Sequence, residues 1–142
     1  MKQKVMLAIR GKQSYKGQEP DTIELVTEGT MEFRDGGCDI CYEETDLTGL
    51  QGVTTTFRVE PEQITLTRTG KLSSQMLFRQ GKPHDSLYQM DFGALMITVC
   101  ATSLLFDLTP AGGFVDLVYS IEIEKSEAGV VDYHLDIRTI ET

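Results

Sequence analysis

The segment DTIELVTEGTMEF, residues 21–33, contains the pattern that decides the fold class. Charged or polar residues in it alternate with the apolar residues Ile23, Leu25, Met31 and Phe33. Because successive side chains of a β-strand point to opposite faces, this pattern predicts a strand with one buried and one solvated face. Gly29 interrupts the buried series. A residue without a side chain at this point predicts a bend or bulge that lets a sheet curl.

The same alternation continues along the chain, and no segment has a helical period. Further strands are expected at residues 5–9, 38–44, 53–59, 64–68, 74–80, 84–90, 95–105, 114–124 and 131–140. Short turn sequences such as Asp35-Gly36-Gly37 and Thr69-Gly70-Lys71 separate them. The composition agrees, since 9 Val, 9 Ile and 16 Thr stand against only 5 Ala.

Short hairpins between consecutive strands predict a meander. A twisted meander of about eight or more strands tends to close on itself, because closure removes the exposed edges. We therefore predict an all-β protein, a single antiparallel up-and-down β-barrel of about 8–10 strands that forms one domain over residues 1–142. The interior of such a barrel has room for side chains and one small ligand.

Charge and composition exclude several classes of function. The chain has 13 Lys and Arg against 22 Asp and Glu, a net charge of −9, and no basic run that nucleic acid or an anionic membrane would need. The apolar residues 5–9 are too few for a signal peptide, and no stretch approaches the ~20 apolar residues of a membrane helix. Three cysteines do not form a disulfide framework. We therefore expect a cytoplasmic protein with reduced thiols that binds neither nucleic acid nor membrane.

A series of short motifs runs from residue 21 to residue 78. They are Ile23-Glu24-Leu25, Glu28-Gly29, Tyr42-Glu43-Glu44-Thr45, Gly49, Gly52, Thr54-Thr55-Thr56, Arg68, Gly70, Met76 and Phe78. Their order and spacing resemble the YwiB-like family of small bacterial proteins, and a weaker likeness continues through Tyr88, Phe92-Gly93 and the last three strands. Met90-Asp91-Phe92-Gly93 departs from the family's Thr-Pro-aromatic-Gly pattern. The resemblance implies a calycin-type (lipocalin-like) β-barrel and brings no established activity.

Arg68 is a charged residue at a position that the pattern predicts to be buried. Ile64 and Leu66 share its phase, and if Val59 pairs with Ile64 across the hairpin turn, then Thr55 faces Arg68. A guanidinium inside a barrel requires an anionic partner, because an unpaired buried charge costs several kcal/mol.

Glu44 is the expected partner of Arg68. Tyr42 and Glu44 share the inward phase of their strand, with Tyr42 opposite Thr55 and Glu44 opposite Val53. The backbones at Glu44 and Arg68 are then roughly 10 Å apart, which two long side chains can bridge. Three interpretations are open: a structural ion pair, an Arg68 anchor for a ligand carboxylate or phosphate, and a catalytic Glu44 acid or base.

We expect the barrel interior to bind a small, partly apolar or anionic molecule, as lipocalin-like barrels commonly do. The residues expected to line this site are Arg68, Glu44, Tyr42, Thr55, Phe57, Met76, Phe78 and Tyr88. One alternative is an enzyme that uses Glu44, Arg68 and His84 in the same cavity. Another is a structural or partner-binding protein with a filled barrel. The volume of the cavity distinguishes these possibilities.

The cysteines and glycines predict no metal or nucleotide site, and we expect no cofactor. Cys38 and Cys41 have CxxC spacing, but residues three apart on a strand point to opposite faces, and no second ligand pair follows. Cys100 is expected to be a small core residue. Gly112-Gly113 lacks the sequence context of a phosphate-binding loop. His134 is expected to face outward.

Overall fold

The computed structural model describes residues 2–15, 19–45, 51–90 and 93–140, and its strands match the predicted segments. Within these ranges it contains ten strands and no helix. The strands are β1 (Lys2–Tyr15), β2 (Asp21–Arg34), β3 (Gly37–Glu43), β4 (Val53–Glu60), β5 (Gln63–Gly70), β6 (Ser74–Phe78), β7 (Pro83–Met90), β8 (Gly93–Thr109), β9 (Gly112–Ile123) and β10 (Ser126–Thr139). The all-β prediction is confirmed. In the same ranges there is no helical segment of the length and apolar character that a membrane span requires.

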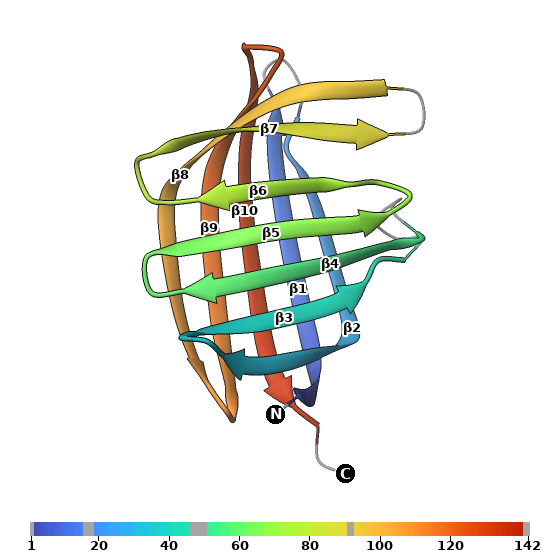
Figure 1. The fold of residues 1–142 in the computed structure, drawn as a ribbon, viewed down its shortest axis with the longest axis vertical. Helices are drawn as coiled ribbons and strands as arrows, with labels where there is room; N and C mark the ends of the chain where they lie inside the picture. The colour runs from blue at the N-terminus through green and yellow to red at the C-terminus, as the bar shows by residue number, and fades with distance from the viewer. Residues whose placement is uncertain (1, 16–18, 46–50, 91–92, 141–142) are drawn as a thin grey trace.

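The strands form one antiparallel sheet that curls into a nearly closed, calycin-like barrel. The strand order is β6-β5-β4-β3-β2-β1-β10-β9-β8-β7, so neighbours in the sheet follow one another in the chain, except where β1 pairs with β10. In Figure 1, β3 to β7 form a front layer that crosses a back layer of β1, β2, β8, β9 and β10. The sheet edges β6 and β7 meet in the front layer, where the backbone N–H of Leu77 donates to His84 Nδ1 (3.3 Å).

Strand β2 connects the two layers. It pairs with β1 from Asp21 to Glu32 but with β3 only from residue 30 onward, and in Figure 1 it bends from the back layer into the front layer. Gly29 lies at the point where pairing with β3 begins. A Cβ added there would lie 2.5 Å from the backbone oxygen of Cys41, so the close approach of β3 requires glycine. This close approach is the structural reason for a glycine at the point where the sequence predicts that the sheet curls.

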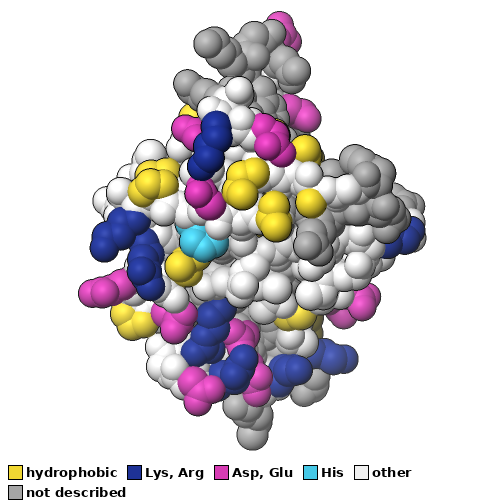
Figure 2. Space-filling model, turned by 45° about the horizontal axis from the view of Figure 1, so that its top comes forward, with side chains coloured by type: hydrophobic (Ala, Val, Ile, Leu, Met, Phe, Trp, Pro, Cys, Tyr) yellow, Lys and Arg dark blue, Asp and Glu magenta, His cyan; other side chains and the backbone are white. Residues whose placement is uncertain are grey.

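Inward-facing side chains at alternate strand positions form one apolar core. The largest fully buried members are Phe57, Phe78, Leu7, Met31, Ile40, Ile64, Leu66, Leu117, Leu135, Val5, Val99 and Val115. Burying a large apolar side chain stabilises a fold by about 1.5–3 kcal/mol, so this core is the main source of stability. On the outer surface, acidic and basic side chains are interspersed over the face shown in Figure 2.

Two predictions about buried residues need correction. Phe33 has the predicted phase but is 39% exposed, because β2 ends there, beyond the core. Cys100 was expected in the core, yet it lies half-buried between the buried residues Val99 and Ala101 and therefore belongs to the outward phase.

Candidate functional site

A row of inward-facing polar residues crosses the front layer. Tyr42, Thr55, Arg68 and Ser74 are direct cross-strand partners on β3, β4, β5 and β6. The pairing of Thr55 with Arg68 confirms the register predicted from the hairpin. Tyr42, Thr55 and Ser74 are buried, and Ser74 Oγ has no hydrogen-bond partner among the described residues. We call these four residues the polar row.

Glu44 adds a buried carboxylate to the polar row. Its backbone N–H donates to Val53 O (2.9 Å), which confirms the predicted position opposite Val53. The Glu44 side chain is buried, and Thr55 Oγ1 donates to Glu44 Oε2 at 2.5 Å. A hydrogen bond of this kind is what keeps a carboxylate tolerable in an apolar interior.

Tyr133 of β10 brings a second hydroxyl to this region, although it is not among the residues that the sequence predicts to line the site. The hydroxyl oxygens of Tyr42 and Tyr133 lie 3.2 Å apart, at hydrogen-bonding distance. The Tyr133 ring also contacts Phe57, with 5.5 Å between ring centroids. Tyr133 shares the inward phase of the buried residues Val131 and Leu135, and this shared phase was the sequence signal that could have identified it.

The two tyrosine hydroxyls are protonated at neutral pH. Burial raises the pKa of Tyr42, and the neighbouring Tyr133 and Glu44 raise it further. Burial likewise raises the pKa of Tyr133, although Arg68 opposes this through its positive charge and a hydrogen bond. Because neither group ionises, both can donate hydrogen bonds beside a carboxylate and a guanidinium.

A small cavity lies between these polar groups and the back layer. Its volume is about 80 Å³. It is lined by Ile9, Gly11, Gln13, Ile23, Leu25, Glu44, Arg68 and Tyr133. A single water needs roughly 10–15 Å³ by this measure, so there is room for a cluster of waters or one compact molecule. We call this space the polar cavity.

The structure separates Phe57, Met76, Phe78 and His84 from the polar cavity. Phe57, Met76 and Phe78 are buried in the apolar core and are not among the residues that line it. Tyr88 belongs to β7, but its side chain lies outside the described part of the structure. His84 is also absent from the cavity lining, and its Nδ1 accepts the Leu77 N–H. The structure therefore does not bring His84 to Glu44 and Arg68.

The cysteines have the geometry that the sequence predicts. Cys38 points into the core, whereas Cys41, three residues further along β3, lies in the outward phase. Within the described residues, no three His, Cys, Asp or Glu side chains are grouped so that they could hold a metal ion.

Comparisons with known proteins identify the family. A family described as "Domain of unknown function (DUF1934)" matches residues 7–137. The crystal structure of the ywiB protein from Bacillus subtilis superimposes with a TM-score of 0.88 at 18% sequence identity, covering 99% of this chain and 94% of that one. No curated protein matches the chain. The match to the family spans most of the sequence, and the chain therefore belongs to the DUF1934 family of YwiB-like barrels.

Proposed function

We propose that the protein is a cytoplasmic small-molecule-binding barrel whose polar cavity holds a compact, partly apolar molecule with an anionic or other hydrogen-bond-accepting group. The observation that carries this proposal is the grouping of Glu44, Arg68 and Tyr133, together with Gln13, around one cavity beside the apolar core. Apolar side chains combined with a few convergent polar groups are the usual lining of a small-molecule site.

Different residues of the lining would contact different parts of such a ligand. The Arg68 guanidinium and the Tyr133 hydroxyl are donors, and they suit a carboxylate or a similar acceptor group. Ile23 and Leu25 of β2 form an apolar wall for a short hydrocarbon part. Glu44, held by Thr55, can accept a hydrogen bond from a donor group of the ligand.

The volume restricts the ligand to a few non-hydrogen atoms. At about 80 Å³ the polar cavity is much smaller than the roughly 300–1,000 Å³ of sites for drug-sized molecules. A short carboxylate fits this size and the donors at one end. The aromatic side chains Phe57 and Phe78 belong to the filled core of the barrel and do not line the cavity.

Native mass spectrometry of the gently purified protein tests the proposal first, by looking for a co-purifying small molecule. Thermal unfolding is then measured with short carboxylates, such as acetate, propionate and lactate, and with the corresponding amides. We expect the carboxylates to raise the unfolding temperature more than the amides, because Arg68 favours an anion.

Two variants on β2 make this test specific. Ile23→Phe adds bulk to the wall of the polar cavity, whereas Val26→Phe changes an outward-facing side chain that is 67% exposed. Carboxylates should still stabilise Val26→Phe but no longer stabilise Ile23→Phe. If carboxylates stabilise both variants equally, or if none of these molecules stabilises the unmodified protein, the polar row serves only the stability of the barrel.

A further inference from the structure

A second and larger pocket lies at the other end of β3 and β4. Cys38 near the start of β3 and Val59 near the end of β4 belong to its wall, whereas Glu44 follows the opposite end of β3. The pocket is lined by Phe33, Arg34, Asp35, Gly36, Gly37, Cys38, Val59, Glu60, Pro61, Phe106 and Leu108. Its volume is about 650 Å³, within the range of roughly 300–1,000 Å³ that small-molecule sites occupy. We call it the apolar pocket.

The apolar wall arises because side chains of the inward phase continue beyond the core. Phe33 is the last inward residue of β2 and is 39% exposed. Phe106 and Leu108 of β8 are only partly buried and pack against the core from the back layer. These side chains leave apolar surface in contact with water, and covering such surface is favourable by about 25 cal/mol per Å².

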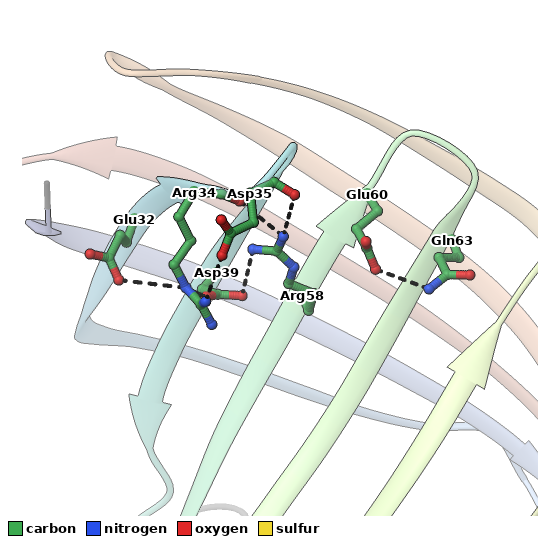
Figure 3. Close-up of polar contacts among 7 residues, drawn as sticks. All are labelled: Glu32, Arg34, Asp35, Asp39, Arg58, Glu60 and Gln63. Carbon is green, nitrogen blue, oxygen red and sulfur yellow. Dashed lines mark hydrogen bonds and ion pairs between the residues drawn. The ribbon is translucent and has the colours of Figure 1, made fainter.

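The charged residues Arg34, Asp35 and Glu60 line this pocket, and Arg34 is contacted by Glu32, Asp39 and Arg58, which lie outside the lining. We call these six residues the rim, and its two arginines are already engaged (Figure 3). Arg58 donates to Asp39 Oδ1 (3.3 Å) and to the backbone oxygens of Arg34 (2.9 Å) and Asp35 (3.0 Å). Arg34 Nε donates to Asp39 Oδ2 at 2.6 Å. Gly37 permits this packing, since a Cβ added there would lie 2.9 Å from Arg58 Cζ.

The rim carries more negative than positive charge. Its carboxylates are Glu32, Asp35, Asp39 and Glu60, and its guanidiniums are Arg34 and Arg58. Glu60 lines the pocket and accepts a hydrogen bond from the neutral Gln63 amide (2.9 Å). The other end of that amide accepts a bond from Arg79 Nε (2.9 Å), and counting Arg79 still leaves one more carboxylate than guanidinium. No ion pair within the described residues involves Glu60.

From these contacts we infer that the apolar pocket binds an amphiphile with a hydrocarbon chain or ring and a positively charged amine head. The apolar part packs against Phe33, Phe106 and Leu108, and the amine lies beside Glu60. A fatty-acid anion is disfavoured, because Asp39 and backbone oxygens already hold the rim guanidiniums and the remaining carboxylates repel it. This site is separate from the polar cavity and has the opposite preference for ligand charge.

Three probes with the same chain test the charge preference: decylamine, decanol and decanoate, each below the concentration at which it forms micelles. Their affinities are measured at neutral pH by displacement of the uncharged fluorophore N-phenyl-1-naphthylamine. We expect decylamine to bind best and decanoate worst, with roughly three- to tenfold between them at low salt and less at high salt. Decanoate binding as tightly as decylamine would overturn the assignment of the amine head.

Matched variants test the location. Leu108→Arg places a bulky cation in the apolar pocket, whereas Leu105→Arg changes an outward-facing side chain on the same strand that is 60% exposed. Binding of all three probes should be lost in Leu108→Arg and kept in Leu105→Arg. Glu60→Gln should weaken decylamine while leaving decanol unchanged. Ile23→Phe, in the polar cavity, should not change the binding of any probe, so the proposals for the two sites can be refuted independently. Equal binding by the two arginine variants would show that the probes do not bind in the apolar pocket.

Discussion

The two ends of the barrel place charge in opposite positions. At one end the buried Glu44 and the half-buried Arg68 face an interior cavity of about 80 Å³ next to the apolar core. At the other end a pocket of about 650 Å³ has an apolar wall, and its arginines and carboxylates lie on the rim. The same types of ion are therefore inside the barrel in one case and next to water in the other.

This difference determines what each charge contributes to stability. A charge removed from water depends on its protein partners, because no solvent compensates for their loss. A charge on an exposed rim keeps its hydration, and its ion pairs contribute little. Substitutions in the polar cavity should therefore affect unfolding strongly, whereas substitutions on the rim should chiefly affect what the apolar pocket binds.

The largest effect is expected for Arg68→Met. The substitution removes the guanidinium that lines the polar cavity together with Glu44, so we expect the free energy of unfolding to fall by roughly 3 kcal/mol or more, unless Glu44 takes up a proton. Combining it with Glu44→Gln should recover much of this loss. Urea denaturation of the two single variants and the double variant measures the coupling. Small and additive single effects would show that Glu44 and Arg68 do not act as a pair.

A smaller effect is expected for the tyrosine pair that Tyr133 of the cavity lining forms with Tyr42. Tyr133→Phe and Tyr42→Phe each remove one hydroxyl of a contact of 3.2 Å, and each should lower the free energy of unfolding. A lost hydrogen bond between neutral groups costs about 0.5–1.5 kcal/mol. Once one hydroxyl is gone, removing the other should cost less, so the double variant should be more stable than the sum predicts. Strict additivity would contradict a contact between the two hydroxyls.

Alternation along the strands was sufficient to predict the register of the hairpin. Val59 pairs with Ile64 and Thr55 pairs with Arg68 because a shift of one residue would turn the whole apolar phase outward. Alternation does not show where a strand leaves the core, and Phe33 is therefore more exposed than its phase suggests. The apolar run around Cys100 has no clear alternation, so its outward phase could not be predicted.

The candidate site was predictable only within neighbouring strands. Tyr42, Thr55 and Arg68 are cross-strand partners, and local pairing places them together. Tyr133 reaches Tyr42 across the barrel from β10, and a strand pattern contains no information about which side chains meet across an interior. The volume of the polar cavity and the position of the apolar pocket also depend on side-chain packing, so a strand pattern could not predict them either.

The histidine on the outer wall of the barrel carries a partly exposed charge, and its contribution to stability can be measured through its pH dependence. His134 of β10 pairs with Asp116 of β9 and with Asp136 (3.1 Å), and Arg10 lies opposite it on β1. The hydrogen bond to Asp116 raises the His134 pKa above its ordinary value of 6.5, and Asp136 contributes in the same direction. The stabilisation is therefore complete below pH ~6.5 and is lost as the pH rises through the higher folded-state value.

Urea denaturation of the unmodified protein and of His134→Gln, between pH 6 and pH 9, measures this effect. The unmodified protein should be the more stable at pH 6, and the difference should become smaller toward pH 9. A difference that stays constant over this range would assign the role of His134 to packing, for example against the Phe114 ring.

The smallest effect is expected for Arg34→Gln on the rim of the apolar pocket. Hydrogen bonding to Asp39 raises the Arg34 pKa, yet the side chain is 53% exposed and remains hydrated. Its removal should therefore leave the urea midpoint unchanged within measurement error. Arg58→Gln is the informative control, since that side chain is only 19% exposed and also holds the backbone oxygen of Asp35, so its removal should lower the midpoint. A loss in Arg34→Gln as large as in Arg68→Met would mean that stability depends on the charges at the rim of the apolar pocket as much as on those at the polar cavity. In that case exposure would not explain the difference between the two ends of the barrel.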